Sequence, residues 1–159
     1  MNEQQYLDQV LLLRRQLYAV AIALLRSDPD AADAVQETVL SGWKHRRSLL
    51  QEDRFRPWLM RILVNKCRDI QRRRLRERRL TERIMTHAAP PSPTNDLYGL
   101  VCQLPDNQRL PVLFYYFDGY SQREIAHILD LEPEQVKTRV RQGRETLRKW
   151  MTEGGFNDA

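Results

Sequence analysis

Residues 134–149 carry hydrogen-bonding and cationic side chains at helical spacing. The stretch holds six Lys and Arg against two Asp and Glu. An apolar stripe is formed by Val136, Val140, Gly143 and Leu147. The opposite face carries Lys137, Thr138, Arg141 and Gln142. These side chains can bind base edges in a DNA major groove, where glutamine can pair with adenine through two hydrogen bonds. Arg139 and Arg144 are better placed to bind phosphates.

The residues before this stretch predict how such a helix would be positioned. Ser121, with Glu124 three residues later, is typical of a capping box at a helix start. A turn is expected at 130–132, and Pro133 suits the first position of a second helix. Residues 118–150 therefore predict a helix-turn-helix. The alternative is an amphipathic hairpin whose polar face is only solvated.

Composition limits the kind of protein that this chain can be. Its 159 residues include 6 glycines and 30% charged residues, which favours helices over a β-rich fold. The two cysteines and three histidines show no zinc-ligand spacing, so neither a metal nor another cofactor is expected. Cys67 fits a small core residue. No secretory signal or membrane-spanning stretch is apparent, so a cytoplasmic protein is expected.

Charge is distributed unevenly along the chain. Residues 1–85 hold 18 basic and 11 acidic residues, whereas residues 86–159 hold 8 and 10. Positive charge placed on particular helices suggests a polyanionic partner, although many basic helices are simply solvated.

A proline-rich segment divides the chain into two domains. Residues 86–96, THAAPPSPTND, contain three prolines and no apolar periodicity, so they predict a flexible linker. The predicted fold class is all-α, with small helical domains at 1–85 and 97–159.

The first domain is expected to contain three or four helices. One is expected from Gln4 to Leu25, and a second after Asp28, which would be its N-cap. A third is expected to begin near Phe55 or Pro57 and to continue into an arginine-rich stretch. The core residues expected in the second helix are Val35, Val39, Leu40 and Trp43.

Three segments give the chain a family resemblance. Residues 30–43, DAADAVQETVLSGW, and 55–74, FRPWLMRILVNKCRDIQRRR, resemble region 2 of bacterial RNA polymerase sigma factors. Residues 104–148 resemble region 4 of the same family. The order, the linker and the length are similar to the extracytoplasmic-function (ECF, group 4) subfamily of the sigma-70 family.

The resemblance implies a partner for one helix face in the first domain. Asp33, Gln36 and Glu37 lie at i, i+3 and i+4, so they share one face of a helix. In the family this face docks on the clamp coiled coil of the β′ subunit of core RNA polymerase. Without the resemblance, a solvated face would be favoured.

The resemblance also implies contacts with the promoter −10 element. Family members bind the non-template strand and hold a flipped base beside the loop that here lies near residues 48–55. Asn65 is expected to bind a base edge or sugar, and Arg61, Lys66, Arg72 and Arg73 to bind phosphates. Trp58 fits a core position better than a base-stacking one.

In region 4 the second helix of the motif would bind the −35 element. Asp130 stands where the family often has glycine, and Gln142–Gly143 replaces a common Arg–Ala pair. Pro111 is expected to mark a helix start after a turn over residues 105–110.

Together these features predict a sigma factor that recruits core RNA polymerase to promoters and opens the −10 region, without catalysis of its own. Its expected partners are core RNA polymerase (β′ clamp coiled coil and β flap), duplex and single-stranded promoter DNA, and an anti-sigma factor, without membrane insertion.

The alternatives are a stand-alone helix-turn-helix regulator that binds duplex DNA as a dimer, and a DNA-processing enzyme with a helix-turn-helix appendage. A regulator has no need of the Asp33/Gln36/Glu37 face, and no carboxylate cluster for metal ions supports the enzyme.

Overall fold

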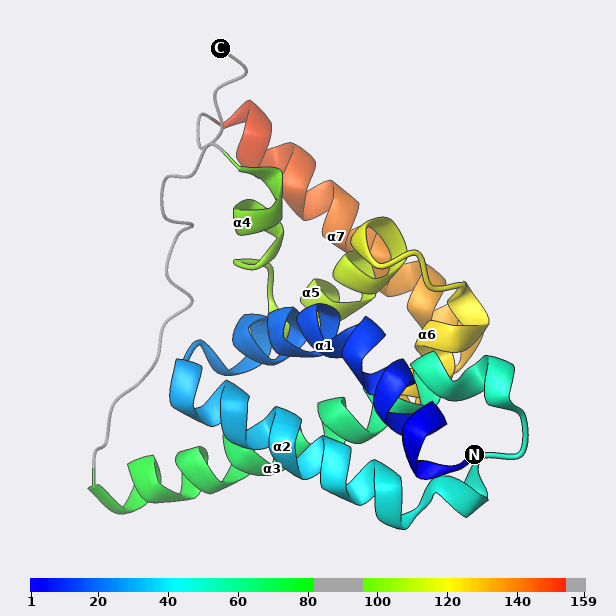
Figure 1. Ribbon diagram of the computed structural model, residues 1–159. Helices are drawn as coiled ribbons and strands as arrows, with labels where there is room; N and C mark the ends of the chain where they lie inside the picture. The colour runs from blue at the N-terminus through cyan, green and yellow to red at the C-terminus, as the bar shows by residue number, and fades with distance from the viewer. Residues whose placement is uncertain (82–95, 154–159) are drawn as a thin grey trace. The chain divides into compact units, whose positions relative to one another are not determined.

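The computed structural model describes residues 1–81 and 96–153, and these residues form helices and no strand (Figure 1). The chain divides into two compact units, Met1–Met85 and Thr86–Ala159. The all-α expectation is therefore confirmed. The predicted linker, apart from Asp96, lies outside the described residues. Within the described residues no helix is long and apolar enough to cross a membrane.

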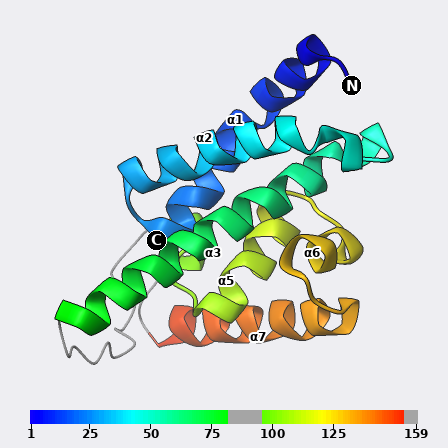
Figure 2. The same cartoon turned by 90° about the horizontal axis from the view of Figure 1, so that it is seen from below.

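Three helices build the first unit. They are α1 (Glu3–Leu25), α2 (Asp28–Lys44) and α3 (Phe55–Thr81), and each packs on the other two. Helices α2 and α3 run side by side in opposite directions (Figure 2). Two 3₁₀ turns, η1 (Arg46–Ser48) and η2 (Glu52–Arg54), connect them. The N-cap of α2 is Ser27, whose hydroxyl accepts from the Asp30 N–H at 3.4 Å, so the assignment of Asp28 as the cap was wrong.

The core-facing side of α2 differs from the sequence prediction. Its buried residues are small: Ala31, Ala34, Thr38 and Gly42. A Cβ added to Gly42 would lie 2.4 Å from Tyr6 Oη and 2.8 Å from Leu59 Cδ1, so α1 and α3 approach α2 closely there. The expected core residues Val35, Val39 and Trp43 are only half-buried, and Leu40 is exposed. The prediction was wrong for Leu40 and only partly right for the other three, because close helix contact on this face selects small side chains.

The larger core side chains of this unit come from α1 and α3. The fully buried set includes Tyr6, Leu17, Leu59, Met60 and Leu63. The Tyr6 hydroxyl donates to the Val39 carbonyl at 2.5 Å. Cys67 is also fully buried, and burial raises the pKa of its thiol to about 12. The thiol therefore stays protonated at neutral pH, as a core residue should.

The second unit contains the helix-turn-helix. Its elements are α4 (Leu97–Val101), α5 (Asp106–Val112), the π-helical turn η3 (Leu113–Phe117), α6 (Gln122–Leu129) and α7 (Pro133–Thr152). The Ser121 hydroxyl accepts from the Glu124 N–H at 3.1 Å, and the Glu124 carboxylate accepts from the Ser121 N–H at 2.9 Å, which confirms the capping box. Asp130 lies in the left-handed region at φ 55°, the conformation for which glycine is favoured.

Pro111 does not start a helix. It lies inside α5, which begins at Asp106. Proline has no N–H to donate to a carbonyl four residues back, so the hydrogen-bond ladder is interrupted there. The helix then continues as the π turn η3, which ends with the Asp118 N–H donating to the Leu113 carbonyl at 3.1 Å.

Candidate nucleic-acid interface

Helix α7 presents one buried and one polar face. Val136, Val140, Gly143 and Leu147 are buried, as the periodicity predicts. They pack against α5 and α6, which fixes the rotation of α7 about its own axis. The outward residues Lys137, Arg141, Gln142 and Arg144 are all exposed. The predicted groove-binding face is therefore accessible within this unit.

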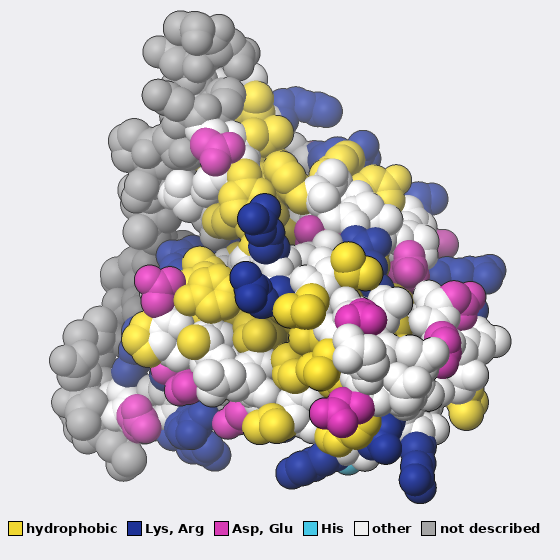
Figure 3. All heavy atoms as spheres, in the orientation of Figure 1, with side chains coloured by type: hydrophobic (Ala, Val, Ile, Leu, Met, Phe, Trp, Pro, Cys, Tyr) yellow, Lys and Arg dark blue, Asp and Glu magenta, His cyan; other side chains and the backbone are white. Residues whose placement is uncertain are grey.

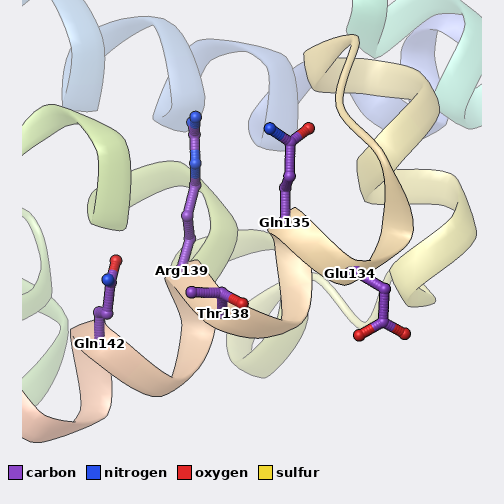
Figure 4. A pocket seen from close by; sticks show the side chains of 5 residues that line it. All are labelled: Glu134, Gln135, Thr138, Arg139 and Gln142. Carbon is purple, nitrogen blue, oxygen red and sulfur yellow. The ribbon is translucent and has the colours of Figure 1, made fainter.

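A shallow hollow lies on this outward side of α7 (Figure 4). Its lining residues are Glu134, Gln135, Thr138, Arg139 and Gln142. In the view of Figure 4, Gln135, Arg139 and Gln142 extend to the same side of the helix. The hollow unites three predicted residues, Thr138, Arg139 and Gln142, whereas Lys137, Arg141 and Arg144 are not part of its lining. The sequence predicts that Arg139 binds a phosphate. In the structure, Arg139 lies beside side chains that are suited to binding base edges.

Two residues of the hollow, Glu134 and Gln135, are not among the predicted DNA-binding residues. Gln135 precedes Thr138, Arg139 and Gln142 by three, four and seven residues, a spacing that the sequence already contained. The Gln135 Oε1 atom accepts from the Glu132 N–H at 2.9 Å and closes a capping box at the start of α7. The amide is therefore held at the N-terminus of α7, the end that contacts base edges in helix-turn-helix proteins.

The predicted −10 residues divide between two faces of α3. Helical geometry places Arg61, Asn65 and Arg72 on one face, and Lys66 with Arg73 roughly a third of a turn away. Asn65, Arg72 and Arg73 are exposed, whereas Arg61 and Lys66 are half-buried. Arg72 pairs with Asp69 at 2.5 Å in an exposed bridge. Exposed bridges of this kind contribute little, so Arg72 can exchange Asp69 for a phosphate.

One arginine of the basic run has a structural role. Arg74 pairs with Asp30 and donates from its other terminal nitrogen to the Leu25 carbonyl at 2.8 Å. These contacts attach α3 to the turn between α1 and α2. Within the arginine-rich stretch 72–79, Arg74 is therefore held by protein contacts and is less available to bind DNA.

Aromatic rings hold both ends of the α2–α3 connection. The Tyr6 ring packs on Trp43 with centroids 5.4 Å apart and on Phe55 at 5.7 Å. Trp58 packs on Phe55 at 5.8 Å and is half-buried, in keeping with a packing role. The Arg46 guanidinium lies 3.7 Å from the centre of the Trp43 ring. The loop predicted to lie beside the flipped base is thus attached to the core of the unit.

The acidic face of α2 is exposed and borders a groove. Asp33, Gln36 and Glu37 are all exposed on one side of the helix. Gln36 also lines two neighbouring hollows between α1 and α2, which include the apolar side chains Val35 and Leu40. Hydrophobic side chains are visible over α1 and α2, among charged ones (Figure 3). Arg14 lines both hollows and Arg15 lines one of them, so the surface combines apolar, acidic and cationic side chains.

In the described residues, no group of three or more His, Cys, Asp or Glu side chains lies close enough to hold a metal ion. The predicted DNA-binding residues of α3 and α7 are cationic, amide and hydroxyl side chains. Such groups suit reversible binding of polyanions by ion pairs and hydrogen bonds.

Two family models match the chain, one over each unit. Sigma-70 region 2 matches residues 10–79, and sigma-70 region 4 matches residues 94–147. The first match covers the α1–α3 bundle with the acidic face and the basic helix. The second covers the helix-turn-helix.

Curated relatives and a solved structure agree with these matches. RNA polymerase sigma factor CarQ of Myxococcus xanthus is 30% identical over 82% of this chain and 79% of its own length. The probable RNA polymerase sigma factor RfaY of Xanthomonas campestris pv. campestris is 29% identical over 82% of this chain, which spans only 36% of that relative. The sigma factor RpoE has been solved in complex with the anti-sigma factor NepR from Bartonella quintana, and it shares the fold of this chain with a TM-score of 0.79. The two sequences are 24% identical, and the match covers 94% of this chain and 98% of RpoE.

Further relatives, matched over most of this chain, are named ECF RNA polymerase sigma factors. With region 2 and region 4 both present and in the family order, the chain belongs to the sigma-70 family of RNA polymerase sigma factors, in its ECF group.

Proposed function

We propose that this chain binds core RNA polymerase in the cytoplasm, directs it to specific promoters and opens the −10 region, without catalytic activity of its own. Residues 1–85 would bind the β′ clamp coiled coil and the −10 element, and residues 97–159 the β flap and the −35 element. The observation that carries the proposal is the pairing of an exposed acidic face on α2 with cationic faces on α3 and α7. A stand-alone regulator does not need the acidic face of α2, because it does not dock on RNA polymerase.

An anti-sigma factor is proposed as a further partner. RpoE was solved with the anti-sigma factor NepR, and CnrH, 25% identical to this chain, with the cytosolic domain of CnrY. The groove beside Gln36, lined by apolar side chains together with Arg14 and Arg15, offers a surface on which such a partner could pack.

Run-off transcription on a library of genomic fragments tests the proposal. Core RNA polymerase and the full chain are combined, and initiation is mapped by sequencing the transcripts. Start sites that share −10 and −35 elements and require the chain would support the function. Duplex binding by the chain alone, without core-dependent initiation, would favour the regulator instead.

Replacing Arg72 and Arg73 by alanine is expected to weaken promoter complexes regardless of sequence. Each lost phosphate contact should flatten the log–log dependence of binding on salt by about 0.7 to 0.9. Promoter complexes of preformed holoenzyme are measured at several salt concentrations. Arg14→Ala with Arg15→Ala removes the same charge from α1 and should leave the slope unchanged. An unaltered slope in the Arg72/Arg73 variant would place these arginines away from the DNA.

Arg141→Ala and Gln142→Ala are each expected to relax the preference at one or two positions of the −35 element. The cost is about 1–3 kcal/mol for each lost bidentate base contact. Arg144→Ala, expected at a phosphate, should weaken binding without altering the preferred sequence. Selection from promoters randomised at −35 measures the profiles. If both the Arg141 and Gln142 variants keep the parental profile, this face of α7 does not bind bases.

A further inference from the structure

The two glutamines of the hollow on α7 differ in what their amide groups can offer to a ligand. Gln135 and Gln142 lie about two turns apart on the helix and extend to the same side in Figure 4. A free side-chain amide presents an acceptor oxygen beside a donor nitrogen, which is the pair that matches the major-groove edge of adenine. An amide whose oxygen is already engaged is less able to make this pairing.

The oxygen of Gln135 is engaged in this way. The Glu132 N–H donates to Gln135 Oε1 at 2.9 Å as part of the capping box at the start of α7. A backbone N–H can donate only to the oxygen of an amide, so this contact fixes which end of the Gln135 amide faces the helix start. The amide nitrogen keeps its two N–H donors, and within residues 1–81 and 96–153 no other group bonds to it.

The position of Gln135 makes these donors available. The side chain is exposed, and Arg139 follows it one turn later along α7. In Figure 4 Gln135 and Arg139 extend to the same side of the helix, whereas Glu134 points to a different side. Because the capping contact already orders the Gln135 side chain, binding a base costs it little further conformational freedom.

Base edges in the major groove divide according to this chemistry. The keto bases, guanine and thymine, present acceptors at O6 and O4, whereas the amino groups of adenine and cytosine donate hydrogen bonds. Guanine adds a second acceptor at N7, so both N–H donors of one amide nitrogen can be used on it. A side chain that offers donors alone therefore favours a keto base over an amino base.

We propose that Gln135 is a specificity-determining residue that donates to guanine or thymine at one position of the −35 element. Its oxygen stays on the Glu132 N–H, and its nitrogen binds the base. Gln142 has no such capping contact in the described part of the chain, so it keeps the amide pairing that suits adenine. This inference rests on the proposed binding of α7 to the −35 element.

The test replaces the donor by an acceptor without removing the cap. In Gln135→Glu the carboxylate can still accept from the Glu132 N–H, as glutamate does in capping boxes, but it has no N–H to donate. Holoenzyme is formed with the full parental chain or with the variant, and functional −35 sequences are selected from a randomised promoter library. Gln142→Glu adds the same charge about two turns along α7 and is the matched comparison. Selection is run at low salt, so that the added charge does not abolish binding.

Gln135→Glu is expected to move the preference at one −35 position from keto bases to amino bases, with the ratio of the two changing by about fivefold or more. Gln142→Glu should alter a different position. Both variants should bind every sequence more weakly, because each brings a negative charge close to phosphates, so the base preference is the readout. Thermal unfolding of Gln135→Glu should occur at or above the parental temperature, since an acidic residue in the first turn of a helix is favourable.

Three results would overturn the inference. An unchanged preference in Gln135→Glu would limit Gln135 to its capping role. A loss of affinity that is equal for all −35 sequences would make Gln135 a phosphate contact. A profile altered only at the position that Gln142→Glu alters would mean that no separate base faces Gln135. Failure of the proposed function is distinguishable, because the parental chain would then direct no initiation on any fragment.

Discussion

Asp33→Arg combined with Glu37→Arg is expected to weaken binding to core RNA polymerase by at least about tenfold, because like charges brought together at an interface cost several kcal/mol. Both carboxylates are exposed on one face of α2, and neither is buried against another helix of the unit. The substitutions should therefore leave the bundle folded. Titration of labelled core polymerase with each variant measures the affinity, and circular dichroism checks the helical content.

The matched control for this docking prediction is Glu3→Arg with Asp8→Arg. It reverses two exposed acidic residues of α1, so the change in net charge is the same. The control should bind core polymerase with close to parental affinity at physiological salt. If the α2 variant also binds normally, the assignment of the Asp33/Gln36/Glu37 face to polymerase docking is wrong.

Gly143→Ala is expected to destabilise the second unit by about 1–3 kcal/mol, the usual cost of overpacking a core. A Cβ at this position would lie 2.4 Å from Val112 Cγ2, so the Val112 side chain or the two helices would have to shift. Alanine is the better helix former by about 1 kcal/mol, but that gain acts only on the helix itself and cannot relieve the clash. Urea unfolding of the variant measures the loss, and weaker −35 binding should accompany it.

A second substitution identifies the cause of that loss. Val112→Ala removes the atom that the new methyl group would meet, at the cost of a cavity when made alone. The double variant should therefore be more stable than the sum of the two single changes predicts. A Gly143→Ala protein as stable as the parental chain would show that α5 and α7 adjust without cost.

Much of the fold follows from local patterns in the sequence. The Ser121–Glu124 capping box and the valine stripe of α7 are properties of neighbouring residues, and both are present in the structure. The buried face of α2 was not predictable in the same way. Its selection of Ala34 and Gly42 depends on how closely α1 and α3 approach, which is a property of the packed bundle.

The candidate sites likewise divide into features that local sequence patterns predict and features that depend on the folded structure. Helical spacing placed Thr138 and Gln142 on one accessible face, as the structure has them, and the same spacing would have included Gln135. The structural role of Arg74 could not be read from a run of arginines, because its partners Asp30 and Leu25 lie far away in the sequence. The roles of the proposed docking and DNA-binding residues stay predictions, since they depend on partners outside the chain.

The small buried side chains of α2 also bear on how a protein of this kind can diverge. The inner face is restricted to residues no larger than threonine, so few substitutions are tolerated there. The outer face contributes little to the core, so packing does not restrict it: Gln36 and Glu37 are limited only by the proposed polymerase contact, and the exposed Leu40 only by a partner in the groove. After gene duplication, a copy could acquire a new inhibitor by changing groove residues such as Leu40 alone, with its fold and its polymerase contact inherited intact.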